Sequence, residues 1–310
     1  MENYLLSVDG GGTKTEFCVS DGEGNLLHSI IVGCSNYKSV GTEGVYESLL
    51  EGLTFLREKG INAADIGYSV WGISGCDSPH DYELVNAIID RLGLPIQKRH
   101  LCNDGILAFY AQADEPGIVI IAGTGSIILG LDKMGKLERA GGWGYNISDI
   151  GSGYWIGAEI LKKTLLYCDG CGGFSPLFDL VREYFKCESF KELPFVVTEV
   201  FNYYEIAKLA RLAVDAAKQK EEVSLCILRE GAGMLAALTE SICRRLEFHG
   251  DGDINIVFSG GVLKDEIYRQ LVQDSIKDRM SPLHITFLSQ ENAPVYGGIK
   301  LAKRLSGRVK

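Results

Sequence analysis

Three glycine-rich segments of this 310-residue sequence each follow an apolar, strand-like stretch and carry hydroxyl or charged side chains beside the glycines. They are Asp9–Thr15, Ala122–Ser126 and Phe258–Val262. Because glycine has no Cβ, the backbone N–H groups of such turns can approach a ligand closely, which suits phosphate oxygens. Several turns of this kind in one chain predict a site for a phosphate chain, and the third turn also suits a nucleoside.

The first of these segments adds charge to its glycines. Asp9 stands at the end of a strand, where its carboxylate can hold Mg²⁺ through water, and Thr13 and Lys14 offer a hydroxyl donor and a positive charge. Neither a Walker A loop nor a G-x-G-x-x-G fingerprint occurs in the sequence, which disfavours those nucleotide folds. Taken alone, the segment is equally well interpreted as a glycine-rich hairpin without a ligand.

A single carboxylate occupies a similar place after another strand. Asp104, in Cys102-Asn103-Asp104-Gly105, follows an apolar stretch and begins a predicted helix. There it can be directed toward a ligand while the positive end of the helix dipole keeps it ionised, as a general base requires. An ordinary helix N-cap has the same sequence signature.

Alternating strands and helices are expected to position these residues. Period-two and apolar stretches predict strands at 4–8, 15–19, 26–32, 68–73, 97–102, 117–122, 126–131, 136–140, 254–258 and 283–288. Helical spacing predicts helices between Thr42 and Gly60, at 81–92, 105–112, 263–276 and 293–305, and through most of 150–250. The block from 117 to 140 repeats the order of the opening strands and turns, which indicates two related lobes.

Composition excludes several classes of function. The 31 basic and 41 acidic residues give a net charge of −10 without a basic cluster, so we expect no nucleic-acid partner. No apolar run approaches the length of a bilayer span, so we expect no membrane association and a cytoplasmic protein. The nine cysteines are scattered through apolar or helical stretches, which is typical of reduced thiols.

Six motifs in fixed order make a resemblance specific. They are Asp9–Thr15, Asn103-Asp104, Ala122–Ser126, Gly141–Gly144, Gly151–Ile156 and Ser259–Gly261. Together they resemble the BadF/BadG/BcrA/BcrD ATPase family, and in particular its N-acetylglucosamine kinase branch. The resemblance implies an α/β, two-lobe actin-like ATPase (ribonuclease H-like) fold, with a mixed five-stranded sheet and flanking helices in each lobe and a cleft between lobes. Residues 1–115 with the C-terminal helix 293–310 would form one lobe, and residues 116–292 the other.

The same resemblance implies an ATP-dependent amino-sugar kinase that uses Mg²⁺ and phosphorylates the C6 hydroxyl of N-acetylglucosamine or a close relative. Asp104 matches the family's catalytic general base. The residues that match the ATP site are Asp9, Gly11, Gly12, Thr13, Lys14, Gly123, Thr124, Gly125, Gly260 and Gly261, with Asp9 also serving the magnesium ion. Those that match the sugar site are Asn36, Ser74, Asp104, Gly142, Trp143, Gly144 and Asp149. Homodimer formation stays open.

One departure from the family pattern concerns the sugar. The chain has Ile150 where the family usually carries a glutamate, which leaves N-acetylglucosamine, N-acetylmuramic acid and glucosamine all open. The alternative function is an ATPase that activates a 2-hydroxyacyl-CoA dehydratase or a benzoyl-CoA reductase through an iron–sulfur cluster, which needs thiolate ligands. Residues 141–160, where those activators carry a cysteine, contain none here. A sugar-sensing repressor is disfavoured by the acidic charge.

Overall fold

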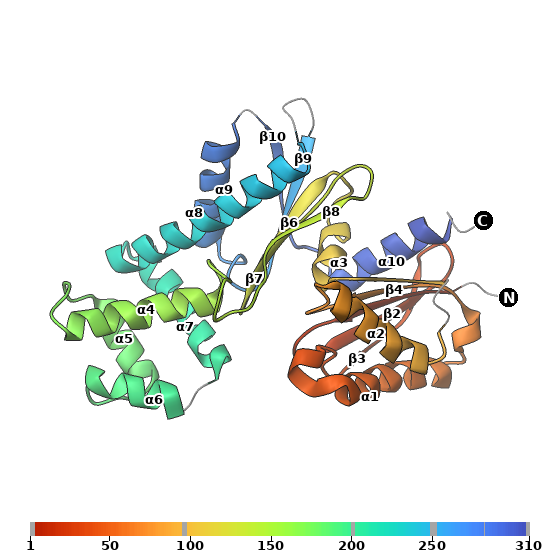
Figure 1. Cartoon of the computed structure of the whole chain (residues 1–310), viewed down its shortest axis with the longest axis horizontal. Coiled ribbons are helices and arrows are strands. Elements are labelled where there is room, and N and C mark those ends of the chain that lie inside the picture. The colour runs from red at the N-terminus through yellow and green to blue at the C-terminus, as the bar shows by residue number, and fades with distance from the viewer. Residues whose placement is uncertain (1–3, 95–97, 200–201, 249–252, 282, 308–310) are drawn as a thin grey trace. The chain divides into compact units, whose positions relative to one another are not determined.

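The computed structural model describes residues 4–94, 98–199, 202–248, 253–281 and 283–307 (Figure 1). The chain divides into two compact units. Unit 1 comprises Met1–Asp114 with Gln290–Lys310, and unit 2 comprises Glu115–Ser289. The boundaries predicted from the sequence fall at 115/116 and 292/293.

Unit 1 is built on a five-stranded mixed sheet in the order β3-β2-β1-β4-β5. Its strands are β1 (Tyr4–Gly10), β2 (Thr15–Ser20), β3 (Leu26–Val32), β4 (Ile66–Ile73) and β5 (Arg99–Cys102). The first three strands form antiparallel hairpins, while β4 and β5 run parallel to β1. The hairpins follow from the short polar turns between the strands, and the parallel pairs from the helical crossovers.

The helices of unit 1 cover this sheet. They are α1 (Tyr37–Glu58), the 3₁₀ turn η1 (Ala63–Asp65), α2 (Pro79–Arg91), α3 (Asp104–Tyr110) and α10 (Pro294–Ser306). Val45, Leu49 and Leu56 of α1 share a buried core with β1, β2 and β4, and α10 packs against β1, β4 and α3 (Figure 1). Helix α10, late in the chain, therefore packs on the sheet that carries the glycine turn after β1.

The start of α1 differs from the sequence prediction. The helix begins at Tyr37 instead of after Thr42, because the Asn36 side chain accepts a hydrogen bond from the Lys38 N–H at 3.0 Å and caps it. Gly41, with φ 72°, then interrupts the helical geometry, so the predicted apolar stripe lies in the segment after this break. The predicted start of β5 at Gln97 lies outside the described residues.

Unit 2 repeats the mixed five-stranded sheet, in the order β10-β9-β6-β7-β8. Its strands are β6 (Gly117–Ala122), β7 (Ser126–Leu131), β8 (Leu137–Gly141), β9 (Asp253–Ser259) and β10 (His284–Ser289). As in unit 1, three strands form antiparallel hairpins and two run parallel to the first of them. Two mixed five-stranded sheets with flanking helices confirm the predicted fold class.

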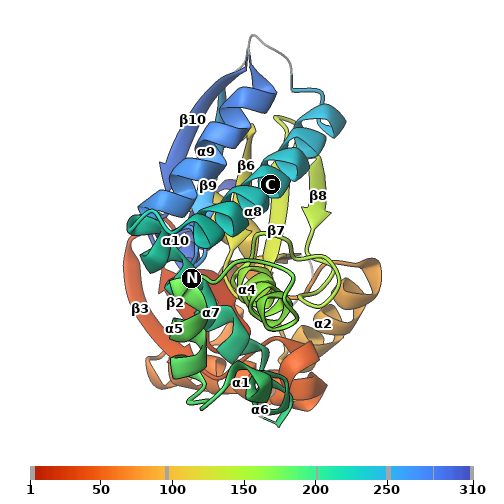
Figure 2. The ribbon, with the colours of Figure 1, turned by 90° about the vertical axis from the view of Figure 1, so that its left-hand side faces the viewer.

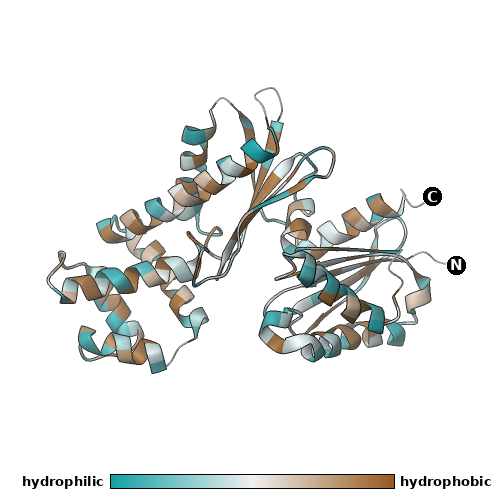
Figure 3. Ribbon diagram, viewed as in Figure 1, coloured by the Kyte–Doolittle hydropathy of each residue, from teal (hydrophilic) through white to brown (hydrophobic). Residues whose placement is uncertain are grey.

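Helices make up most of unit 2 between its third and fourth strands. They are α4 (Gly153–Cys168), α5 (Pro176–Tyr184), η3 (Phe190–Glu192), α6 (Leu193–Glu199), α7 (Tyr203–Lys218), α8 (Glu222–Arg245) and, after β9, α9 (Glu266–Met280). The long helix α8 lies beside α9 and packs on β7 and β8 (Figures 1 and 2). Apolar residues gather on the strands and on one stripe of each long helix, which builds the core of the unit (Figure 3).

Among the described residues, we find no helix whose length and hydropathy would let it cross a lipid bilayer.

Candidate functional site

The carboxyl ends of three parallel strands meet at one edge of the sheet in unit 1. Gly10 of β1 pairs in register with Ile73 of β4, and Gly72 of β4 pairs with Cys102 of β5. The glycine turn after Asp9, the segment that begins with Ser74, and the Asn103-Asp104 pair therefore all leave the sheet at this edge. This is where ligands bind in sheets with parallel strands.

The glycine turn after β1 is held from two sides. Ser74 N–H donates to the Gly10 carbonyl at 2.7 Å, and Ser35 N–H donates to the Gly11 carbonyl at 3.3 Å. A Cβ on Gly10 would overlap the Ser35 hydroxyl, so a larger residue cannot fit there. Gly11 and Gly12 are half-buried, whereas Thr13 and Lys14 at the tip are exposed. The backbone of the turn is thus fixed while its polar side chains can meet a ligand.

Asp104 opens α3 and titrates near neutrality. The Gly105 N–H donates to the Asn103 Oδ1 at 2.8 Å and to the Asp104 Oδ1 at 3.1 Å. Burial, with the nearby carboxylates of Asp9 and Asp77, raises the pKa of Asp104 to about 7. Burial and Glu16 also raise the pKa of Asp9, to about 6. Two carboxyl groups with raised pKa values on one sheet edge are typical of an acid–base or cation-binding site.

The raised pKa of Asp104 predicts a pH-dependent stability. Because the folded-state pKa of about 7 exceeds the ordinary value of 3.8, the neutral carboxyl contributes stability that is complete below pH about 4 and is lost as the pH rises through about 7. We expect the Asp104→Asn variant to melt roughly 2–8 °C above the wild type at pH 8, which corresponds to about 1 kcal/mol or more, and the difference to vanish toward pH 4. Scanning calorimetry across this range measures it. A difference that does not change with pH would contradict the assigned environment.

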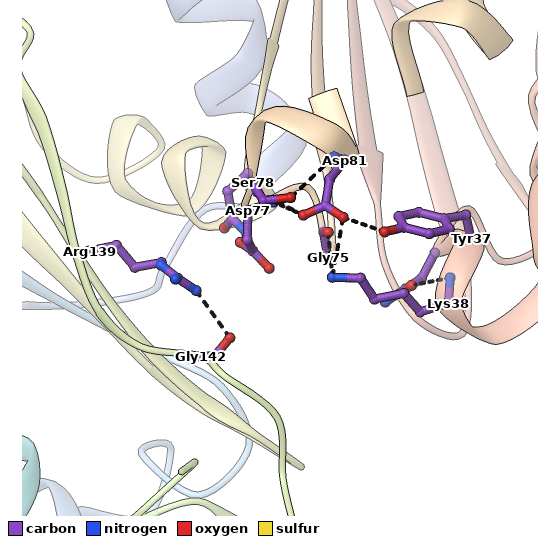
Figure 4. A network of polar contacts seen from close by, with 10 residues as sticks. Tyr37, Lys38, Gly75, Asp77, Ser78, Asp81, Arg139 and Gly142 are labelled. Carbon is purple, nitrogen blue, oxygen red and sulfur yellow. Dashed lines mark hydrogen bonds and ion pairs between the residues drawn. The ribbon is translucent and has the colours of Figure 1, made fainter. Parts of the chain in front are cut away.

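A polar network joins the start of α1 to the segment after β4 (Figure 4). The Asp81 carboxylate accepts hydrogen bonds from the Ser78 N–H at 2.7 Å and the Asp77 N–H at 3.0 Å, and Tyr37 Oη donates to it. Lys38 Nζ pairs with Asp81 at 3.6 Å and donates to the Gly75 carbonyl at 2.9 Å. Although burial raises the pKa of Asp81, these hydrogen bonds outweigh it and hold the pKa low. Asp81 therefore remains charged and fixes the segment.

Asp77 is a site residue that sequence reasoning missed. Its Oδ1 accepts a hydrogen bond from Asn103 Nδ2 at 2.7 Å, and its charge helps to raise the pKa of Asp104. The signal in the sequence was a second carboxylate shortly after a strand, since Asp77 follows β4 as Asp104 follows β5, although at a greater distance along the chain. Its proximity to Asn103 depends on the pairing of β4 with β5.

The Asn36 side chain lies beside the segment that begins with Ser74. Ser74 is half-buried directly after β4. A Cβ on Gly75 would lie 3.2 Å from Asn36 Oδ1 and 3.3 Å from its Nδ2, so the amide packs against the backbone of the next residue. The Asn36 Oδ1 is engaged as the cap of α1, while within the described chain its Nδ2 donates no hydrogen bond. A donor is left for a ligand.

The two glycine turns of unit 2 touch each other. Val262 N–H donates to the Ala122 carbonyl at 3.0 Å, and β6 pairs with β9 up to Ile121 and Ser259. Gly260 has φ 95°, and a Cβ there would overlap the Ala122 carbonyl oxygen and approach the Gly123 nitrogen to 2.9 Å. Only glycine lets the turns pack this closely.

A pocket of about 950 Å³ opens beside these turns within unit 2. Gly123, Thr124 and Gly261 line this pocket. Gly125 and Gly260 do not line it, but the absence of a Cβ at these positions allows the close packing of the turns. One polar face of α7 forms much of the remaining wall: Tyr204, Lys208, Arg211, Asp215 and Lys218. The volume suits a nucleoside or a ligand of similar size.

Helix α7 carries none of the motifs identified in the sequence, yet it lines this pocket. Its pocket-lining residues recur at intervals of three and four, and this polar stripe is the signal that was available. Lys218 Nζ pairs with Asp215 at 3.1 Å and with Asp265 at 2.8 Å. Since Asp265 caps α9, this network ties the wall of the pocket to the turn that carries Gly261.

The Gly141–Ser152 loop is locked onto the first turn of unit 2. The Gly153 N–H donates to the Gly123 carbonyl at 2.7 Å, and Ser126 Oγ donates to the Ile150 carbonyl at 2.9 Å. Asp149 is only 8 % exposed, accepts from the Gly144 N–H at 3.1 Å and lies against Gly125. Asp149 therefore stabilises the conformation of the loop.

Trp143 stands out from this loop with 67 % of its surface exposed. The Arg139 guanidinium lies 3.8 Å from the centre of its ring and donates to the Gly142 carbonyl at 3.2 Å. Gly142 itself, with φ 70°, has no room for a Cβ against Ile127. One face of the indole is therefore covered by Arg139, and the ring still offers a large apolar surface.

Asp9 and the glycine turn beside it are suited to a divalent cation that binds together with the phosphates of a ligand. Within the described ranges, no group of three or more His, Cys, Asp or Glu side chains is arranged to hold a metal ion by itself. Mg²⁺ commonly takes one or two carboxylates, several waters and substrate phosphates. Asp9, a half-buried carboxylate beside the glycine turn, matches this requirement, and its raised pKa reflects a charge that a cation would stabilise.

Comparison with known proteins gives consistent matches over most of the chain. The family model described as the BadF/BadG/BcrA/BcrD ATPase family matches residues 6–293. An N-acetyl-D-glucosamine kinase of Dictyostelium discoideum is 30% identical over 293 residues, which are 88% of this chain and 91% of the relative. An N-acetylmuramic acid/N-acetylglucosamine kinase of Clostridium acetobutylicum is 28% identical over 308 residues, 97% of this chain and 98% of the relative.

Solved structures share the fold. A crystal structure from Chromobacterium violaceum matches with a TM-score of 0.76 at 23% identity, covering 97% of this chain and 99% of that one. A ROK family glucokinase from Streptomyces griseus, in complex with glucose and AMPPNP, matches with a TM-score of 0.57 at 16% identity, covering 99% of this chain and 100% of that one. At these identities the likeness concerns architecture, which both structures share with this chain.

Proposed function

The chain belongs to the BadF/BadG/BcrA/BcrD ATPase family, and from that premise we propose that it is an ATP-dependent amino-sugar kinase. The reaction transfers the γ-phosphate of ATP to the C6 hydroxyl of N-acetylglucosamine or a close relative. The curated relatives that match most of this chain are named as kinases of such sugars, which supports the proposal. An ATP analogue bound to the structurally similar glucokinase supports ATP as the donor.

The observation that carries the proposal is the Asp104 carboxylate. It takes the proton of the C6 hydroxyl as that oxygen forms its bond to the γ-phosphorus and the bond between the γ-phosphorus and the bridging oxygen of ADP breaks. A base works best when its pKa lies near the working pH, because it is then both ionised and able to hold the proton. The pKa of about 7 matches this requirement. Asp77 contributes by raising that pKa.

Unit 2 would hold the nucleotide. Its pocket offers the flat ring of Tyr204 and the cations of Lys208 and Arg211, and Thr124 supplies a hydroxyl and an N–H group at the turn. In unit 1 the Gly12–Lys14 part of the turn offers backbone N–H groups and the Lys14 charge to phosphate oxygens, while the Gly11 N–H closes the turn on the Lys14 carbonyl. Mg²⁺ bound with the nucleotide would neutralise phosphate charge, with Asp9 as its protein carboxylate.

Each unit offers groups that we propose as sugar contacts. Asn36 Nδ2 can donate to a ring hydroxyl, and Ser74 offers a hydroxyl beside it. From the loop of unit 2, the Gly142 to Gly144 backbone and the indole of Trp143 provide hydrogen bonds and an apolar surface for a pyranose. Asp149 holds this loop in shape through the Gly144 N–H.

Coupled ADP release tests the function. We expect ADP formation that depends on sugar across a panel of N-acetylglucosamine, N-acetylmuramic acid, glucosamine and glucose, with an amino sugar as the best acceptor. The activator alternative is separated by iron and acid-labile sulfide analysis of protein purified without oxygen. ATP hydrolysis that no sugar stimulates, together with about one cluster per dimer, would overturn the kinase proposal.

A further inference from the structure

Arg139 carries a positive charge that no described carboxylate neutralises. It is half-buried near the end of β8, yet no Asp or Glu oxygen of the described chain lies within ion-pair distance of its guanidinium. One N–H group donates to the Gly142 carbonyl at 3.2 Å, and the planar group stacks on Trp143 at 3.8 Å. The stacking and the hydrogen bond fix the orientation of the guanidinium, and its other N–H groups have no acceptor among the described residues. Such a preformed fork suits a carboxylate.

The surroundings of Arg139 are positive although the whole chain is acidic. Arg245 donates to the Arg139 carbonyl at 2.7 Å and pairs with Glu138 at 2.6 Å, and Lys136 pairs with the same Glu138 at 3.4 Å. Two cations thus share the Glu138 carboxylate, and Arg139 beside them pairs with no carboxylate of the described residues. An anionic ligand would be attracted to this place and a cationic one repelled.

The neighbouring loop presents no exposed carboxylate beside Arg139. Among residues 141–152 the only acidic side chain is Asp149, which is buried and engaged with the Gly144 N–H. Position 150 is an isoleucine, and Ile147 exposes 78 % of its surface. A ligand held at Gly142 and Trp143 would therefore meet an exposed apolar side chain of the loop and the oriented guanidinium of Arg139 on β8.

We propose that Arg139 binds an acidic substituent of the sugar, so that the substrate class includes amino sugars that carry a carboxylate, of the type of N-acetylmuramic acid. The inference rests on the proposed function, since it places the sugar at the Gly142–Gly144 backbone. A sugar held there has its ring substituents within reach of a guanidinium that already contacts Gly142. Free glucosamine, which is cationic at neutral pH, is disfavoured by the same charges.

The test compares two sugars that differ only in the lactyl ether. N-acetylmuramic acid carries it, with its carboxylate, on the C3 oxygen, and N-acetylglucosamine does not. In Arg139→Met, which keeps an unbranched apolar stem and removes the guanidinium with its charge, we expect the ratio of kcat/KM for the acidic sugar over the neutral one to fall by about 10–100-fold, mainly through KM. Arg139→Lys should restore part of the ratio. Lys133→Met, an equal charge change in the exposed turn between β7 and β8, should leave the ratio unaltered.

Titration calorimetry of each sugar without nucleotide keeps this test independent of catalysis. If no sugar is phosphorylated but the acidic sugar still binds through Arg139, the kinase proposal fails and the Arg139 assignment stands. An unchanged ratio in Arg139→Met, equal losses for both sugars, or no binding of the acidic sugar by the wild type would each overturn the assignment.

Discussion

Replacing Asp104 by asparagine should lower kcat for sugar phosphorylation by about 10²–10⁴-fold, with only a small change in the apparent KM for the sugar. Asparagine keeps the size and the hydrogen-bonding capacity of the side chain but cannot accept the C6 proton. Steady-state kinetics at pH 8, with Asp114→Asn as a control on an exposed carboxylate, measures the effect.

The pH dependence of the wild type strengthens this test. Since the base must be ionised, kcat/KM should fall as the pH drops below about 7, the pKa assigned to Asp104. The variant should lose this acidic limb. It should also remain folded, because removal of the buried charge stabilises unit 1 at pH 8. A variant with wild-type kcat, or a wild-type profile flat from pH 5 to 8, would contradict the role of Asp104.

The second large effect is expected from Gly260→Ala. The new Cβ would overlap the Ala122 carbonyl oxygen, and the residue would be held at φ 95°, which costs a non-glycine residue about 1–2 kcal/mol before the overlap is counted. The turns that carry Thr124 and Gly261 must then separate. We expect the KM for ATP to rise by about 10–100-fold, since the pocket wall is displaced.

Two control experiments test whether the effect of Gly260→Ala is confined to nucleotide binding. Gly233→Ala changes a glycine of α8 whose Cβ would meet nothing within 4 Å, so ATP binding should be kept. Calorimetric binding of the sugar to Gly260→Ala without nucleotide should stay close to the wild type. If the variant bound ATP normally, the contact between the two turns would not matter for the nucleotide.

Most of the secondary structure could be predicted from the sequence because each element is locally consistent. The apolar strands of both sheets, the polar hairpin turns and the helices between parallel strands all carry their own signals. The family motifs then fix the order of strands, since the same topology appears in solved structures with a TM-score as high as 0.76. The ends of helices were harder to predict, because the N-cap at Asn36 and the break at Gly41 each depend on a single residue.

The site could be predicted only where glycine motifs or strand ends mark it. Asp77 and the polar face of α7 carry no motif, and they join the site through pairing and packing that one sequence does not show. In the sequence, Arg139 is indistinguishable from an ordinary strand residue. Only the structure shows that its guanidinium stacks on Trp143 and pairs with no carboxylate of the described residues. The structural roles of Asp149 and Asn36, which we also propose near the sugar, likewise become visible only through their hydrogen bonds.

Phosphorus NMR of the reaction products tests the central claim most directly. After incubation with ATP, Mg²⁺ and N-acetylglucosamine or N-acetylmuramic acid, the account predicts ADP and one new phosphomonoester whose phosphorus couples to the C6 methylene protons. Release of inorganic phosphate without any phosphorylated sugar, or phosphorylation at another hydroxyl, would contradict it.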